Sequence, residues 1–140
     1  MMRNVEETIG NFVRKGSVVQ LSYLNQDGFP VTKAMLKPRI IEGIKYYYFT
    51  TNTSSNKVKC LKTNNKACIY FYNQRFYRGV CLIGTIEVLE DYEIKKEVWK
   101  DGDEMFYPKG YVDSDYCVLK FTAIEGSYFC NLKNERFEIK

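Results

Sequence analysis

The residues best suited to chemistry are hydroxyl and basic side chains in one short polar segment. Thr50 and Thr51 end an apolar, strand-like run, Ser54 and Ser55 follow in a turn, and Lys57 comes next. The free N–H groups and the dipole at a helix start favour an anion. Lys57 adds a positive charge where the dipole disfavours one, which a phosphate would compensate. The segment predicts a phosphate site, and an ordinary capped helix with a solvated lysine stays open as the alternative.

The sequence contains no histidine, which excludes several kinds of site. A Ser-His-Asp or Cys-His nucleophile, a His-ligated metal and a haem with a proximal His all need an imidazole. Five cysteines form no CxxC pair and no disulfide-like framework, so we expect reduced thiols in a cytoplasmic protein. No catalytic side chain and no metal ligand is predicted, and a bound cofactor would carry any chemistry.

Length and composition favour one small β-rich domain over residues 1–140. Aromatic residues make up 16%, which suits pleated, half-buried surfaces. The first residues lack a secretory signal, and no apolar run approaches the roughly 20 residues of a membrane helix. We therefore expect a cytoplasmic protein with no membrane partner. The aromatic and basic run 70–78 fails the RNP1 pattern after Gly79, and the net charge of +4 is small, so no nucleic-acid partner is expected.

Periodicity and turn residues predict six or seven strands with two or three short helices, a β-barrel with helical inserts. The expected helices are Val5–Arg14, Asn56–Lys62 and Glu90–Trp99. The expected strands are Ser17–Leu24, Pro30–Leu36, Lys45–Thr51, Ala67–Tyr72, Tyr77–Leu89, Asp115–Ala123 and Gly126–Leu132, with a paired tail at Arg136–Ile139. Gly79 and Gly84 suggest bends or bulges. The acidic clusters 101–104 and 113–115 lack calcium-loop spacing and are expected to be solvated loop charges.

Three segments resemble the pyridoxamine 5'-phosphate oxidase family. Thr51–Lys57, read as TNTSSNK before a short helix, is similar to its FMN-phosphate segment. Pro30–Leu36 resembles its P-x-x-R-x-V-L strand, with Lys33 in place of Arg. Val80–Glu87 resembles its V-x-V-x-G-x-V-E strand. The resemblance extends over residues 5 to 132 and implies an FMN-binding split barrel.

The resemblance also implies a cofactor site. Lys57 and Ser55 would bind the FMN phosphate, helped by Lys33, Ser54 and Asn56. The flavin ring would be held by Thr50, Thr51 and main-chain groups of Ala34, Met35 and Leu36. Flavin sites of this fold lie between two subunits, so a homodimer is implied, with the aromatic residues of 70–78 and 105–107 at its interface.

The sequence departs from the true oxidase in ways that matter for activity. Gly79 and Cys81 stand where the oxidase has Gln and Arg, and its C-terminal Arg and His pattern is missing. The general-stress-protein-like branch is the closer resemblance, which implies an FMN-dependent oxidoreductase that reduces a small oxidised compound of unknown identity. A non-catalytic flavin-binding or storage module and a deazaflavin-dependent reductase on the same fold remain alternatives.

Overall fold

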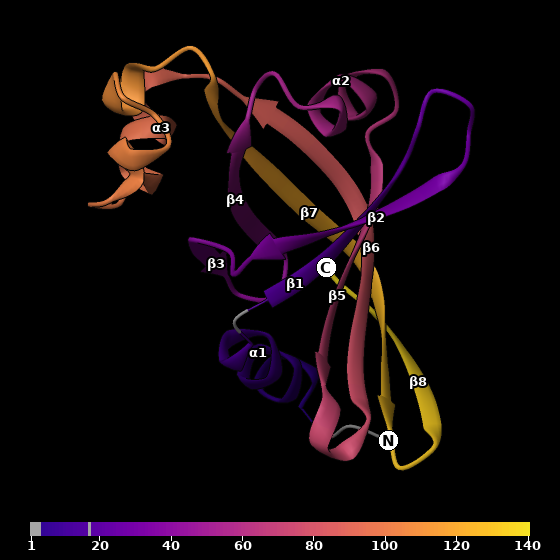
Figure 1. The fold of residues 1–140 in the computed structure, drawn as a ribbon. Helices are drawn as coiled ribbons and strands as arrows, with labels where there is room; N and C mark the ends of the chain where they lie inside the picture. The colour runs from indigo at the N-terminus through magenta and orange to yellow at the C-terminus, as the bar shows by residue number, and fades with distance from the viewer. Residues whose placement is uncertain (1–3, 17) are drawn as a thin grey trace.

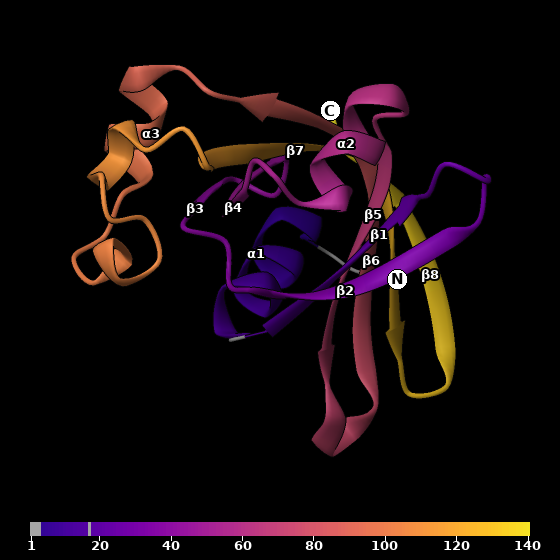
Figure 2. The same cartoon turned by 45° about the horizontal axis from the view of Figure 1, so that its top comes forward.

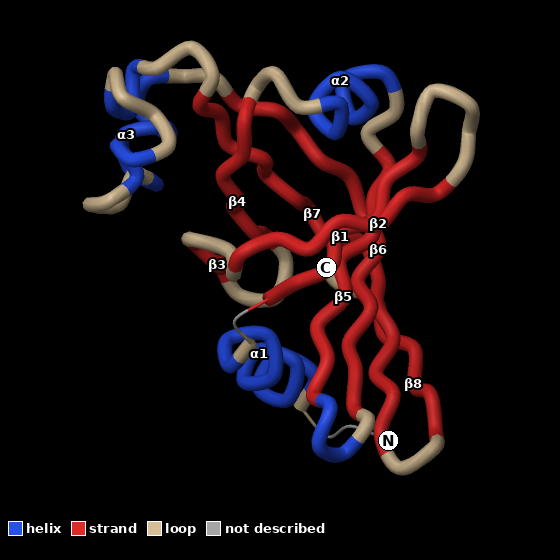
Figure 3. Tube along the Cα trace, viewed as in Figure 1, coloured by secondary structure: helices blue, strands red, loops and turns tan. Residues whose placement is uncertain are grey.

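The structure, a computed structural model, describes residues 4–16 and 18–140 and is built on one antiparallel sheet of eight strands that curls on itself (Figures 1 and 3). The main path runs β2-β1-β5-β6-β7-β4-β3, and β8 pairs with β7. The strands are β1 Val18–Leu24, β2 Pro30–Leu36, β3 Ile40–Glu42, β4 Tyr46–Asn52, β5 Lys66–Asn73, β6 Arg78–Leu89, β7 Tyr116–Cys130 and β8 Lys133–Glu138. The helices are α1 Val5–Lys15, α2 Asn56–Thr63 and α3 Tyr92–Val98, with short 3₁₀ turns η1 Gln74–Phe76, η2 Asp103–Met105 and η3 Gly110–Val112. The mostly-β architecture with short helices is confirmed.

The curl of the sheet encloses the apolar core. Along β1, Val19, Leu21 and Tyr23 are buried while their neighbours are partly or fully exposed, the alternation of a strand with one face on the core. Ser17, where this strand was expected to begin, lies outside the described residues. None of the helices in the described ranges is long and apolar enough to cross a membrane.

Helix α1 packs against the core that the curled sheet encloses and lies near the beginning of β1 (Figure 2). It begins after Asn4, whose side chain accepts a hydrogen bond from the Glu7 N–H, an N-cap that satisfies one of the free donors. Ile9 and Val13, four residues apart, are both fully buried in the core. The predicted helix is therefore confirmed, one residue longer than expected.

The prediction of two separate strands after residue 115 was wrong. A single strand of 15 residues, β7, pairs with β6 along one edge and with β4 and then β8 along the other. The strand continues through Gly126. A glycine occupies this position for packing, because a Cβ there would collide with the side chains of Leu82 and Phe137. The predicted irregularity at Gly84 is confirmed, since the β6–β7 register shifts between Ile83 and Gly84.

The insert between β6 and β7 is anchored by a buried ion pair. The two terminal nitrogens of Arg39 donate to the two carboxylate oxygens of Asp103, each at 2.9 Å. The Asp103 carboxylate also accepts from the Lys100 N–H at 3.0 Å. Asp103 was expected to be a solvated loop charge, and that prediction was wrong because its partner lies 64 residues away in the sequence.

Asp103→Asn should lower the free energy of unfolding by about 2 kcal/mol at pH 7, since it removes a charged hydrogen-bond acceptor. The bonds from Arg39 hold the pKa of Asp103 below its ordinary value. A lowered carboxyl pKa stabilises the fold above the unfolded pKa of about 4, and that contribution is lost as the pH falls through the folded pKa. The difference between the two proteins should therefore shrink from pH 7 to pH 3 in urea denaturation, with the exposed Asp101→Asn as control. A difference that stays constant between these pH values would contradict this account.

Candidate functional site

The turn between β4 and α2 is held by a carboxylate from the start of β7. Asp115 accepts from the Ser54 N–H at 2.8 Å with one oxygen and from the Asn52 side-chain amide at 3.0 Å with the other. Its main-chain carbonyl accepts from the Thr53 N–H at 2.8 Å. The bonds from Asn52 and Ser54 lower the pKa of Asp115, so it stays ionised. The turn therefore leaves β4 in one fixed direction.

This geometry presents the first turn of α2. Ser55 is the N-cap residue, and its hydroxyl oxygen accepts from the Val58 N–H at 3.4 Å. The N–H groups of Asn56 and Lys57, the first two of the helix, have no acceptor within it. The Ser55 hydroxyl keeps its own proton to donate. The start of the helix therefore offers three hydrogen-bond donors.

Lys57 is a half-buried cation in this first turn. No described carboxylate forms an ion pair with it. Burial lowers the pKa of its ammonium group, and the positive charge of Lys33 on β2 lowers it further, against an opposite effect of Cys117. The charge of Lys33 on β2 therefore reaches Lys57 on α2. Neither lysine belongs to any of the described ion pairs with a carboxylate.

Strand β2 presents the residues expected to hold a flavin ring. It ends the sheet path, so only one of its edges is paired, to β1. Half of its main-chain donors and acceptors are thereby left free of the sheet ladder. Met35 is buried in the core, whereas Lys33, Ala34 and Leu36 are exposed.

The remaining predicted residues occupy different surroundings. Thr51 is buried and Thr50 half-buried, both paired to β7 near the turn. Ser54 is exposed, but its N–H is engaged by Asp115. The Asn56 side-chain oxygen accepts from the Gln26 amide at 2.8 Å, which ties α2 to the β1–β2 turn and leaves only the Asn56 NH₂ group for a ligand.

Sequence reasoning missed the residues that support the site. Asp115 was expected to be a solvated loop charge, and its role in holding the turn was missed because its hydrogen-bond partners lie 61 and 63 residues away. Asn52 connects this network to the insert, since its side-chain oxygen accepts from the Tyr107 hydroxyl at 3.4 Å. The sequence carries one possible signal, an acid at position 115 directly before an apolar, strand-like run. No group of three possible metal ligands occurs in the part of the chain that the structure describes.

Comparisons with known proteins show what the chain is similar to. A family model described as "Pyridoxamine 5'-phosphate oxidase like" matches residues 9–138. A Clostridium acetobutylicum protein related to general stress protein 26 of B. subtilis, of the pyridoxinephosphate oxidase family, is 37% identical, with a TM-score of 0.89 over 99% of this chain and 97% of that one. None of the curated proteins compared with the sequence matches it.

Two more distant structures share the fold. A pyridoxamine 5'-phosphate oxidase-related, FMN binding protein from Nostoc punctiforme is 11% identical, with a TM-score of 0.73 over 100% of this chain and 99% of that one. A heme binding protein from Mycobacterium smegmatis is 15% identical, with a TM-score of 0.78 over 99% of this chain and 59% of that one. The split-barrel fold implied by the sequence is thereby confirmed.

Asp115→Ala should loosen the turn before α2, because the Ser54 and Asn52 donors lose their acceptor. Hydrogen exchange followed by mass spectrometry should show faster exchange in segment 52–57. Asp101→Ala, an exposed acid in the insert, should leave that segment unchanged. Equal protection of segment 52–57 in the Asp115→Ala and wild-type proteins would show that the carboxylate does not hold the turn.

Proposed function

The chain belongs to the pyridoxamine 5'-phosphate oxidase-like family, and from this premise we propose that it binds FMN, with the phosphate at the start of α2. The observation that carries the proposal is the half-buried Lys57 ammonium, which has no described ion-pair partner and whose pKa is lowered by burial and by the charge of Lys33. A phosphate would offset both the burial and the repulsion. Charge-assisted hydrogen bonds of this kind are among the strongest in proteins.

The donors of this region suit a phosphate monoester. Anionic oxygens need hydrogen-bond donors. The main-chain N–H groups of Asn56 and Lys57 and the two lysine ammonium groups can only donate, and the Ser55 hydroxyl can donate as well. Asp115, the nearest acid of the turn, is already engaged by Asn52 and Ser54. The helix start and Lys57 would therefore bind the phosphate, while Lys33 would add charge from β2.

The free edge of β2 would hold the ring of the flavin. Main-chain groups of Ala34, Met35 and Leu36 would contact its polar edge, and Thr50 and Thr51 would lie where the ring continues towards the phosphate. FMN supplies the hydride chemistry when it is bound. The side chains of this protein would bind and orient the cofactor and keep water from one face of it.

For the activity, the proposal is an FMN-dependent oxidoreductase that reduces a small oxidised compound in the cytoplasm. A non-catalytic flavin-binding or storage module would bind FMN equally well. Reduction of the bound flavin by a nicotinamide donor, followed by reoxidation with an added acceptor, separates the two. A flavin that the donor does not reduce, with the cofactor fully bound, would favour the storage module.

Two other cofactors are distinguishable from FMN. A deazaflavin could use the same fold, and its absorption spectrum and mass differ from those of FMN. A haem, as in the name of the M. smegmatis neighbour, would need a Cys or Tyr ligand here, because the sequence contains no histidine. A haem carries no phosphate group for Lys57 and the start of α2.

Lys57→Ala should weaken FMN binding by roughly ten- to a hundredfold, since a hydrogen bond to a charged group contributes about 1.5–3 kcal/mol. Riboflavin, which lacks the phosphate, should bind both proteins nearly equally. The measurement is a titration of apoprotein with each flavin, followed by flavin fluorescence. Lys59→Ala, an exposed lysine on the same helix, is the matched control and should change neither affinity. Equal losses for FMN and riboflavin would mean that Lys57 does not bind the phosphate.

The protein should be a homodimer that completes the flavin site. Several apolar side chains in the expected interface segments are exposed, among them Tyr77, Met105 and Phe106. Tyr107, by contrast, is buried within its own chain. Light scattering at micromolar concentration should give about twice the chain mass of 16.5 kDa. Met105→Glu with Phe106→Glu should shift the mass towards the monomer, whereas Leu132→Lys, exposed outside both segments, should not. A wild-type monomer with cofactor bound would contradict the prediction.

A further inference from the structure

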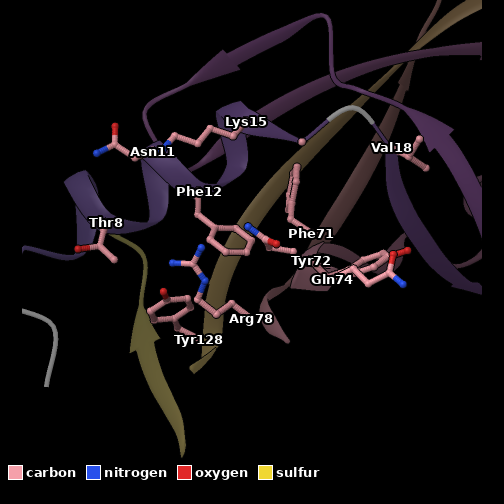
Figure 4. A pocket seen from close by; sticks show the side chains of 12 residues that line it. Thr8, Asn11, Phe12, Lys15, Val18, Phe71, Tyr72, Gln74, Arg78 and Tyr128 are labelled. Atoms are coloured by element: carbon pink, nitrogen blue, oxygen red, sulfur yellow. The ribbon is translucent and has the colours of Figure 1, made fainter. Parts of the chain in front are cut away.

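A cavity of about 690 Å³ lies between α1 and the ends of β5, β6 and β7 (Figure 4). Such a volume is within the range of small-molecule sites. None of the ten residues proposed to bind FMN lines it. Its described lining residues are Thr8, Asn11, Phe12, Lys15, Gly16, Val18, Phe71, Tyr72, Asn73, Gln74, Arg78 and Tyr128.

The lining is cationic and aromatic. Lys15 and Arg78 are its charged members, and no acid occurs among the described residues that line it. A cavity lined by charges of one sign raises the local concentration of ions of the opposite sign. The rings of Phe12 and Tyr128 meet edge to face, with centroids 5.9 Å apart, and form one wall.

Arg78 is held in this wall with unused hydrogen-bonding capacity. Its guanidinium group lies 5.9 Å from the centroid of the Phe12 ring and 5.2 Å from that of Phe76. Its Nε is buried without a hydrogen-bond partner among the described residues. In Figure 4 the guanidinium group lies between the rings of Phe12 and Tyr128. A buried N–H without an acceptor is costly, and a carboxylate is the acceptor that matches a guanidinium group.

We propose that this cavity binds a planar aromatic carboxylate, with its ring against Phe12 and Tyr128 and its carboxylate on Arg78. Lys15, at the end of α1, adds a second positive charge. The inference does not rest on the proposed flavin function. Five of the lining residues belong to segment 70–78, which is expected at the dimer interface, so binding has to be measured on the protein in the oligomeric state it adopts in solution.

The probe is 2-naphthoate, with the neutral 2-naphthamide as matched control, titrated by calorimetry at pH 7 into the full-length protein. The naphthoate should bind and the amide should bind at least roughly tenfold more weakly, since only the former offers a charged acceptor. Arg78→Met should weaken naphthoate binding by roughly ten- to a hundredfold, and Arg78→Lys by less. Arg75→Met removes a nearby exposed arginine that does not line the cavity, and should have no effect.

Four results would overturn the proposal: no binding of naphthoate, equal binding of the amide, an Arg78→Met affinity equal to wild type, or a loss in Lys57→Ala as large as in Arg78→Met. The last would place the probe at the phosphate site, so the two sites are tested separately. If Arg78→Met does not fold, as judged by circular dichroism, Lys15→Gln takes its place. It should weaken naphthoate binding and reduce its dependence on salt, and an unchanged affinity would contradict the proposal.

A different observation concerns two thiols on neighbouring strands. The Sγ atoms of Cys68 on β5 and Cys81 on β6 are 3.2 Å apart. In the register of the two strands Cys68 lies opposite Ile83 and Cys81 opposite Tyr70, so the cysteines are diagonal neighbours. Both are half-buried, whereas Cys60 and Cys117 are buried.

We infer that Cys68 and Cys81 form a reversible disulfide when the protein meets hydrogen peroxide. The Cys81 thiolate attacks one peroxide oxygen, the O–O bond breaks, and a sulfenic acid and hydroxide form. The Cys68 sulfur then attacks the Cys81 Sγ, the S–S bond forms, and the S–O bond breaks. In total two thiols and one peroxide give one disulfide and two waters.

The surroundings favour Cys81 as the sulfur that attacks the peroxide. Its hydrogen bond with Cys68 lowers the pKa of Cys81 to about 7, while the same bond raises the pKa of Cys68. The thiolate is the reactive form of cysteine.

Peroxide treatment of the native protein, followed by denaturation and thiol titration, should remove two of its five thiols. Peptide mapping should show a link between Cys68 and Cys81 that dithiothreitol reverses. Cys68→Ser should leave a sulfenic acid on Cys81 that dimedone traps, and Cys130→Ser should behave as wild type. A link between other cysteines, or no link while dimedone labels Cys81 in the wild-type protein, would overturn the inference.

Discussion

The contact on which the candidate site depends is the Asp115 carboxylate on the β4–α2 turn. It joins the end of β4 to the start of β7 through the Ser54 N–H and the Asn52 amide, at 2.8 and 3.0 Å. Both oxygens of the Asp115 carboxylate already accept hydrogen bonds from these donors. The carboxylate therefore fixes the turn, and it forms no described ion pair with Lys57. The helix start therefore combines rigid geometry with uncompensated positive charge, which is what an anion site requires.

The curled sheet brings the second half of the site to this helix start. Strand β2 ends the sheet, so its outer edge offers main-chain groups to a ligand, while Met35 alone is buried in the core. Lys33 on that strand acts on the pKa of Lys57, although the two residues belong to different elements. A closed barrel would have no such edge, whereas β2 and β3 are the two ends of this sheet path.

Local sequence was sufficient where local physics decides the structure. Helix α2 starts where the Ser55 cap predicts it, and α1 follows the spacing of Ile9 and Val13. The errors all came from partners distant in sequence. Gly126 suggested the beginning of a separate strand. In the structure it lies inside one long strand, where the side chains of Leu82 and Phe137 leave no room for a Cβ. Asp103 was expected to be a solvated loop charge, but the fold brings Arg39 to it. The role of Asp115 in holding the turn was missed, because its partner Ser54 lies 61 residues away. The convergence of Lys33 with Lys57 likewise depended on the family resemblance, because no local pattern relates the two.

The most direct test of the account is the identity of the cofactor that copurifies with the protein. Mass spectrometry of the small molecules released by denaturation should find FMN, in an amount that approaches one molecule per chain. The phosphate is the decisive part, because the account places two lysines and a helix start on it. Riboflavin without its phosphate, a deazaflavin, a haem, or no binding of added FMN by the purified apoprotein would each contradict it.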